Sequence, residues 1–135
     1  MEGFLGKWKL SKSTKFDEFM TAVGVNFVLK KMANLATPTQ TITQNEDGEI
    51  HIKTETSFKT TDLKFKLGEE FEEKTADGRS VKTTINLEDG KLVQIQPGSS
   101  GKDISITREI KDEIYLMTLV CKNVTCTREY SKLAE

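Results

Sequence analysis

From residue 39 onward, hydrophobic and polar residues alternate in short segments. The stretch "EIHIKTETSFK" places Ile50, Ile52 and Phe58 in one parity and His51 and Lys53 in the other. Successive side chains of a strand point to opposite faces, so this alternation indicates a half-buried strand. Similar segments are "DLKFKLG", "RSVKTTINL", "KLVQIQ", "KDISITREI", "EIYLMTLVC" and "VTCTREY". Turn signals such as "NEDGE", "ADGR" and "LEDGK" separate them, which predicts an antiparallel barrel or sandwich.

The residues before this region carry a helical period instead. Four apolar residues lie at positions i, i+3, i+4 and i+7, namely Phe16, Phe19, Met20 and Val23. Thr14 precedes them, and Asp17 follows it by three residues, which is a variant of the capping box. Gly24 marks the expected end of this helix.

A second short helix is predicted in "FVLKKMANLA", with Asn26 as its N-cap and Pro38 beyond its end. A leading strand is expected around Lys7–Ser11. There is no repeat, low-complexity segment or linker in the sequence, so we expect one domain over residues 1–135.

The last two strands place an arginine on an inner face. "CKNV" is typical of a two-residue turn, which pairs Met117 with Arg128 and Tyr115 with Tyr130. Arg128 and Tyr130 therefore share a face with Tyr115, Met117 and Leu119. A guanidinium on that face is buried next to apolar residues.

Other polar residues share the inner parity as well. Arg108 has the parity of Ile104, and Gln94 and Gln96 have the parity of Leu92. A buried guanidinium without partners is very costly, so two of them do not fit a dry core. The interior is predicted to be a partly polar, water-containing cavity.

Composition excludes several classes of protein. The 20 basic and 21 acidic residues are scattered, with a formal net charge of −1, so no basic field indicates nucleic-acid binding. No apolar run approaches the ~20 residues of a membrane helix. The stretch "MEGFLGKWKL" has charges among its apolar residues and lacks the pattern of a signal peptide, so a cytosolic location is expected.

The usual signs of catalysis are missing from the sequence. Cys121 and Cys126 lack zinc-site spacing and are expected as free thiols. The single histidine, His51, falls on the polar parity of its strand, and no nucleophile-elbow motif is present. We expect Trp8 to pack at the barrel floor, and we expect a non-enzymatic protein without a metal or cofactor.

At this point, the sequence resembles the intracellular fatty-acid-binding protein family, which includes the cellular retinoid-binding proteins. The resemblance covers the whole chain and rests on "FLGKWKL" with "FDEFMTAVGV", on "TSFKTTDLKFKLGEEFEEKTADGR", and on "CTREY". It looks most similar to the muscle, adipose and myelin members. Lys15 and the loop "QPGSSGKD" depart from the pattern of those members.

The resemblance implies an all-β fold: a ten-stranded up-and-down antiparallel barrel with a helix-turn-helix lid and a water-filled cavity. It implies a cytoplasmic, monomeric carrier of long-chain fatty acids, with nuclear entry allowed, that delivers its ligand between membranes and enzymes. The family's carboxylate-binding residues map onto Arg108, Arg128 and Tyr130. We expect Arg128 and Tyr130 to touch the carboxylate directly and Arg108 to act through water or as a second contact.

The remaining expected site residues fall into three groups. The cavity wall is expected at Phe16, Met20, Val25, Thr54, Phe58, Ala76, Asp77, Gln96, Ile104, Ile106, Tyr115 and Met117. An internal water network is expected at Glu73, Asp77, Arg79 and Gln96. The portal, where transient contact with anionic membranes is expected, comprises Phe27, Lys30, Lys31, Met32 and Phe58.

Other interpretations stay open at the level of sequence. A retinoic-acid carrier would use the same arginines and tyrosine. A secreted lipocalin also has Gly-x-Trp near its first strand, and a small enzyme inside the barrel is a third class. Arg128 and Tyr130 could also form a structural ion pair with an internal carboxylate such as Glu73. Lys30 and Lys31 could simply be solvated surface residues.

Overall fold

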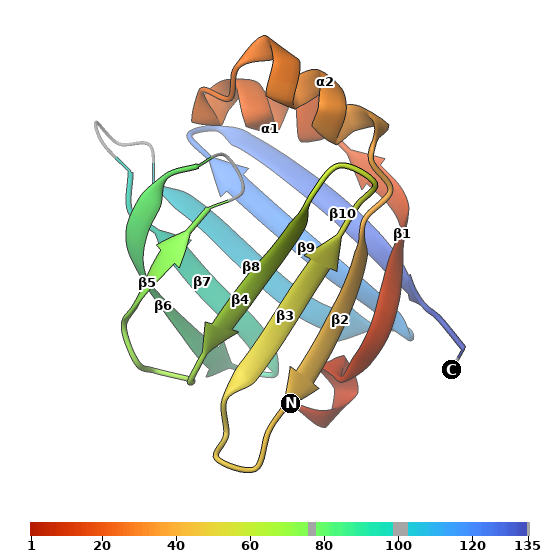
Figure 1. Ribbon diagram of the computed structural model, residues 1–135, viewed down its shortest axis with the longest axis vertical. Coiled ribbons are helices and arrows are strands. Elements are labelled where there is room, and N and C mark those ends of the chain that lie inside the picture. The colour runs from red at the N-terminus through yellow and green to blue at the C-terminus, as the bar shows by residue number, and fades with distance from the viewer. Residues whose placement is uncertain (76–77, 99–102, 135) are drawn as a thin grey trace.

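The computed structural model describes residues 1–75, 78–98 and 103–134, and it confirms the expected antiparallel barrel (Figure 1). A short 3-10 helix, η1 (Glu2–Phe4), precedes the barrel. The strands are β1 (Gly6–Thr14), β2 (Thr39–Gln44), β3 (Ile50–Glu55), β4 (Thr60–Phe65), β5 (Phe71–Lys74), β6 (Ser80–Glu88), β7 (Lys91–Gln96), β8 (Ile104–Lys111), β9 (Ile114–Cys121) and β10 (Val124–Lys132).

The strands form one ten-stranded sheet in the order β4-β3-β2-β1-β10-β9-β8-β7-β6-β5. Strand β1 therefore pairs with β10 in the middle of the sheet, while β4 and β5 are its two ends. Between those ends, the rings of Phe65 and Phe71 stack with centroids 5.8 Å apart. Aromatic packing thus joins the two end strands where the order contains no pairing.

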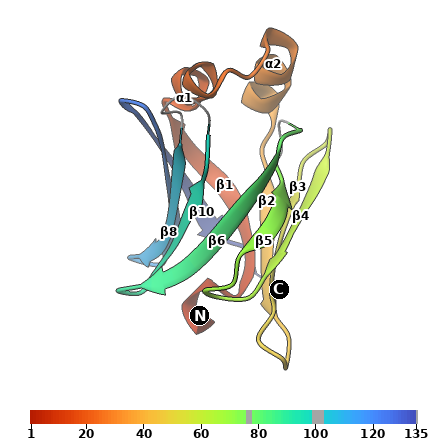
Figure 2. The same cartoon turned by 90° about the vertical axis from the view of Figure 1, so that its left-hand side faces the viewer.

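Two helices cover one end of the barrel (Figures 1 and 2), with α1 spanning Phe16–Val23 and α2 spanning Phe27–Leu35. Phe19 and Met20 of α1 are buried against the strands, whereas no residue of α2 is buried. Within the described residues, neither helix has both the length and the apolar character that a membrane span requires.

The predicted start of α1 is wrong. Thr14 belongs to β1 and pairs with Thr127, because the β1–β10 register shifts between Leu10 and Lys12 and lets the strand continue. The N-cap is Lys15, in the left-handed region with φ 63°, and it makes no side-chain capping bond. Sequence shows the capping pattern but not the long-range pairing that extends the strand.

The other helix boundaries agree with the sequence. Gly24, with φ 98°, ends α1, and its N–H donates to the carbonyls of Met20 and Thr21. Asn26 caps α2, since its Oδ1 accepts from the Leu29 N–H at 3.0 Å. Helix α2 ends at Leu35, one residue before the end of the predicted segment.

The end of the barrel away from the helices is tightly packed around Trp8. The Trp8 side chain is 2% exposed, and its Nε1 donates to the Phe4 carbonyl at 2.9 Å. The ammonium of Lys132 lies 4.7 Å from the Trp8 ring centroid and donates to the Leu5 carbonyl at 2.6 Å. Gly6 has φ 129°, a conformation that a side chain would strain, and a Cβ there would lie 2.7 Å from Lys132 Cε and would displace the end of the lysine.

The predicted register of the last hairpin is confirmed. Cys121 pairs with Val124, Met117 with Arg128 and Tyr115 with Tyr130. Cys121 and Cys126 are buried thiols that form no disulfide among the described residues. This register carries Arg128 and Tyr130 to the inside of the barrel, where both are buried.

Candidate functional site

A cavity of about 360 Å³ lies inside the barrel beneath the helices. Most of its wall is apolar, with α1, α2 and strands from both halves of the sheet contributing side chains. Among the residues expected at the site, the wall includes Phe16, Met20, Val25, Met32, Thr54, Phe58, Gln96, Ile104, Ile106, Met117, Arg128 and Tyr130. Ala76 and Asp77, also expected there, lie outside the described residues.

Tyr115 corrects one expectation, because it is fully buried and does not line the cavity. Its ring packs against Trp8 with centroids 5.5 Å apart and against Tyr130 at 5.1 Å. Its hydroxyl donates to Gln40 Oε1 at 2.7 Å. Tyr115 therefore belongs to the packed floor beneath the cavity.

Arg128 is a cation on the cavity wall, and its hydrogen bond and its ring contact are with uncharged groups. It is 5% exposed, its Nη1 donates to Ser13 Oγ at 3.0 Å, and its guanidinium carbon lies 3.8 Å from the Phe16 ring centroid. Among the described residues, no carboxylate forms a salt bridge with it. A buried charge in this state is electrostatically incomplete.

Tyr130 lies two residues further along β10, on the same inner face. Burial raises the pKa of the Tyr130 phenol, although the charges of Arg128 and Arg108 oppose that rise. Burial likewise raises the pKa of Tyr115. Both hydroxyls stay protonated at neutral pH, so Tyr130 can donate a hydrogen bond to an anion.

Arg108 lies behind the wall and not on it. It is 5% exposed, and its Nη1 donates to Gln94 Oε1 at 2.6 Å. Its Nε is buried and has no partner in the described part of the chain. Arg108 and Arg128 thus each donate to an uncharged side chain, but only Arg128 lies on the cavity wall.

Glu73 on β5 is the acceptor of a compact polar network that joins β5, β6 and β7 behind the cavity wall. Its Oε1 accepts from Thr83 Oγ1 at 2.9 Å and from Gln94 Nε2 at 2.8 Å, and its Oε2 accepts from Gln96 Nε2 at 3.0 Å. These neutral donors occupy the carboxylate that the sequence offered as an ion-pair partner for Arg128. Of the residues predicted to share a water network, Glu73 and Gln96 are joined by a direct hydrogen bond. Asp77 lies outside the described residues, and Arg79 lines the cavity.

Gln40 and Ser13 are among the polar residues of the site that the sequence did not predict; the cavity wall also includes Thr56, Lys59, Thr61 and Thr75. Gln40 shares the parity of Ile42 in "TQTITQ", and this signal could have placed it inside. Ser13, the partner of Arg128, carries no such signal, because it follows the shift in the β1–β10 register. Where the register of a strand shifts, the alternation of inward and outward side chains is interrupted, so inward-facing residues beyond the shift cannot be predicted from alternation.

The expected portal residues do not share one environment. Phe27 and Met32 on α2 are 73% and 36% exposed, and Phe58 is 50% exposed. Two further apolar residues of α2 that were not predicted for the portal, Val28 and Leu35, are 64% and 71% exposed. Lys30 is turned back toward α1, where its Nζ donates to Thr21 Oγ1 at 2.9 Å and lies 3.9 Å from Asp17 Oδ1. Lys31 is exposed.

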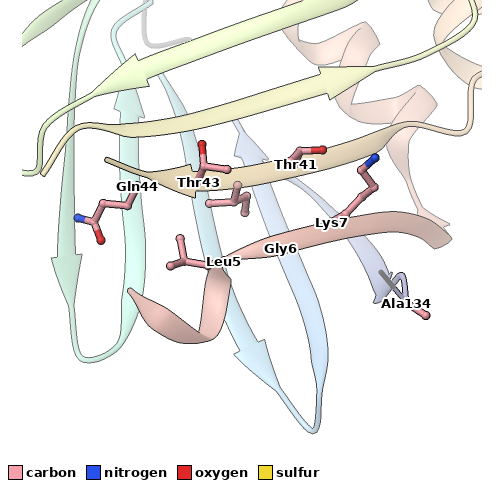
Figure 3. A pocket seen from close by; sticks show the side chains of 8 residues that line it. Leu5, Gly6, Lys7, Thr41, Thr43, Gln44 and Ala134 are labelled. Carbon is pink, nitrogen blue, oxygen red and sulfur yellow. The ribbon is translucent and has the colours of Figure 1, made fainter. Parts of the chain in front are cut away.

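A second hollow, of about 510 Å³, lies at the end of the barrel away from the helices (Figure 3). It lies between the start of β1 and the end of β2, and the lining residues are Leu5, Gly6, Lys7, Thr41, Ile42, Thr43, Gln44 and Ala134. Its only ionisable side chain, Lys7, is exposed. It offers no buried polar group for a ligand, so the helix-covered cavity is the better candidate site.

Comparisons with known proteins agree with this architecture. A family model described as the lipocalin / cytosolic fatty-acid binding protein family matches residues 5–132. The chain is 48% identical over 128 residues to "Sodium/calcium exchanger regulatory protein 1" of Doryteuthis pealeii, covering 95% of each chain. It is 46% identical over 134 residues to human "Fatty acid-binding protein 9", covering 98% of this chain and 99% of the relative.

Among solved structures, the chain is similar to a Schistosoma mansoni fatty acid binding protein in complex with arachidonic acid. The TM-score is 0.92 at 38% sequence identity, with coverage of 99% of this chain and 98% of that one.

Proposed function

Because the chain belongs to the lipocalin / cytosolic fatty-acid binding protein family, we propose that it carries a long-chain fatty acid inside its barrel. The carboxylate is held by Arg128 and Tyr130, with Arg108 as a second, more distant contact. The similar Schistosoma mansoni protein, whose structure contains arachidonic acid, supports this class of ligand.

The observation that carries the proposal is the state of Arg128. Its guanidinium is buried at the cavity wall with a hydroxyl and an aromatic ring as neighbours, and it has no carboxylate partner among the described residues. A planar guanidinium can form two parallel hydrogen bonds with a carboxylate and stays charged at any relevant pH. A ligand carboxylate therefore supplies the counter-charge that Arg128 lacks.

The rest of the cavity suits a hydrocarbon chain. Apolar side chains such as Phe16, Met20, Ile104 and Met117 form much of its wall. Each methylene moved from water into such an environment contributes about 0.8 kcal/mol. Affinity then comes from the chain, and orientation comes from the head group.

Helix α2 is proposed to mediate transfer of the ligand to membranes. The apolar side chains of Phe27, Val28 and Leu35 point to solvent, and Lys31 adds an exposed positive charge. An exposed apolar surface with a basic residue suits transient contact with an anionic membrane. We place this carrier in the cytoplasm as a monomer that exchanges its ligand with membranes through the helix-covered end.

Calorimetry with oleate and methyl oleate tests the assignment. A hydrogen bond to a charged group is worth about 1.5–3 kcal/mol, and the ester cannot form the charged pair, so the acid should bind at least about tenfold more tightly. Retinoic acid, in competition with oleate, separates the fatty-acid function from the retinoid alternative. Equal affinity for acid and ester would mean that Arg128 does not recognise a carboxylate.

A further inference from the structure

Two glutamines on β7, Gln94 and Gln96, donate to the same carboxylate, but their amide oxygens have different hydrogen-bond partners. Both donate through Nε2 to Glu73, at 2.8 Å and 3.0 Å. The Oε1 of Gln94 accepts from Arg108 at 2.6 Å. The Oε1 of Gln96 has no hydrogen-bond partner among the described residues.

The orientation of the Gln96 amide follows from Glu73. An ionised carboxylate only accepts hydrogen bonds, so the amide nitrogen must face it and the amide oxygen must face away. Gln96 is 6% exposed and lines the cavity, whereas Glu73 does not line it. The oxygen of Gln96, which has no partner among the described residues, therefore faces the cavity interior, where it is open to a hydrogen-bond donor on a ligand.

The chemistry of this acceptor defines what it can bind. It requires a hydrogen-bond donor, so it does not accept a carboxylate, which would also be repelled by the charge of Glu73 behind it. It lies on β7, far from Arg128 on β10, with β8 and β9 between them in the sheet. A neutral hydroxyl on the hydrocarbon chain is the group that fits.

The strand register shows where on the chain that hydroxyl lies. Gln96 pairs with Ile104, Ile104 pairs with Cys121, and Cys121 pairs with Val124, so the four lie in one row across the sheet. Val124 precedes Arg128 on β10 by four residues. Four residues of strand span about 13 Å. The hydroxyl must therefore be in the distal half of a long acyl chain, not beside the carboxylate.

We propose that Gln96 forms a second polar subsite, which selects long-chain fatty acids carrying a hydroxyl group in the distal half of the chain. The subsite rests on the proposed carrier function, since the carboxylate at Arg128 sets the position of the chain. The two polar contacts together fix which way the ligand lies in the barrel.

Calorimetry with stearate and its mono-hydroxylated isomers tests the subsite. One isomer has its hydroxyl next to the carboxylate, and the others carry it at successive carbons of the distal half. The proteins are the wild type, Gln96→Met and Gln96→Lys. The lysine variant keeps a donor for Glu73 and so controls for loss of folding, but its ammonium can also donate to a hydroxyl oxygen, so Gln96→Met carries the test of the acceptor.

The matched control is Gln40→Met. Gln40 lines the same cavity, but its Oε1 is already engaged by the Tyr115 hydroxyl. Each protein is described by the ratio of its affinity for a hydroxylated isomer to its affinity for stearate, which cancels general effects on the cavity.

For at least one distal isomer, we expect this ratio to fall about tenfold in Gln96→Met and to stay near the wild-type value in Gln40→Met. The isomer with the hydroxyl beside the carboxylate should show no dependence on Gln96. If stearate binds but every ratio is unaffected by Gln96→Met, the subsite is refuted. If stearate itself does not bind the wild type, the carrier function is refuted instead.

Discussion

Replacing Arg128 with glutamine should move ligand affinity and the stability of the ligand-free protein in opposite directions. Glutamine is polar enough to keep a hydrogen bond with Ser13, but it removes the charge that no carboxylate of the described residues balances. We therefore expect the wild-type arginine to increase ligand affinity and to lower the free energy of unfolding of the ligand-free protein.

The magnitudes follow from the contacts of Arg128. Its burial costs several kcal/mol after relaxation. The hydrogen bond to Ser13 and the position over Phe16 offset part of that cost, with the contact to the ring worth about 0.5–2 kcal/mol. We expect Arg128→Gln to raise the free energy of unfolding of the empty protein by ~1–2 kcal/mol. Losing the charged pair should weaken oleate binding by about tenfold to a hundredfold.

Urea unfolding of the delipidated protein measures the first quantity, and calorimetry with oleate measures the second. The single tryptophan, Trp8, is buried at the closed end of the barrel and reports unfolding by its fluorescence. Delipidation matters, because a ligand at a hundred times its Kd adds about 2.7 kcal/mol to apparent stability.

Arg108→Gln is the matched control. Arg108 already donates to Gln94, so its removal leaves a buried acceptor unpaired and should not stabilise the empty protein. An Arg128→Gln protein that is less stable than the wild type by 1 kcal/mol or more, or that binds oleate with unchanged affinity, would refute this account of the buried charge.

Other expectations concern α2 and the buried phenols. Lys31→Glu should slow fatty-acid transfer to anionic vesicles at low salt while leaving equilibrium affinity unchanged, and Lys64→Glu on β4 should change neither. Asn26→Ala should cost ~1 kcal/mol and speed amide exchange within α2, whereas an aspartate there should preserve the cap. Because burial raises the pKa of Tyr115 and Tyr130, the unfolded state loses phenolic protons that the native state keeps once pH passes ~10. The free energy of unfolding should then fall by up to ~1.4 kcal/mol per pH unit for each tyrosine, as pH-dependent urea unfolding will show, and a flat profile would contradict their burial.

Much of the fold follows from local signals in the sequence. Period-two alternation and turn residues predict the strands, and the turn at "CKNV" fixes the register that brings Arg128 opposite Met117. The Asn26 cap also depends on neighbouring residues alone, and the structure confirms it. These features need no knowledge of which distant strands meet.

The parts that sequence could not supply depend on long-range contacts. Parity shows that Tyr115 and Arg108 face inward, but not that both lie behind the cavity wall. The hydrogen bond between Gln94 and Arg108 joins the neighbouring strands β7 and β8. How far this bond lies from the cavity depends on how the barrel closes, which the sequence does not show. The extension of β1 to Thr14 likewise depends on a shift in its pairing with β10.

The pairing of β1 with β10 in the middle of the sheet has a consequence for biosynthesis. The Ser11 hydroxyl contacts the carbonyl of Glu129, 118 residues away in the chain. The sheet therefore stays in two separate parts on the ribosome until β10 has left the exit tunnel. Because β10 also carries Arg128 and Tyr130, a nascent chain acquires its ligand site in the same step that joins the two parts. A chain truncated before Val124 should be held by chaperones as an incomplete sheet with exposed strand edges.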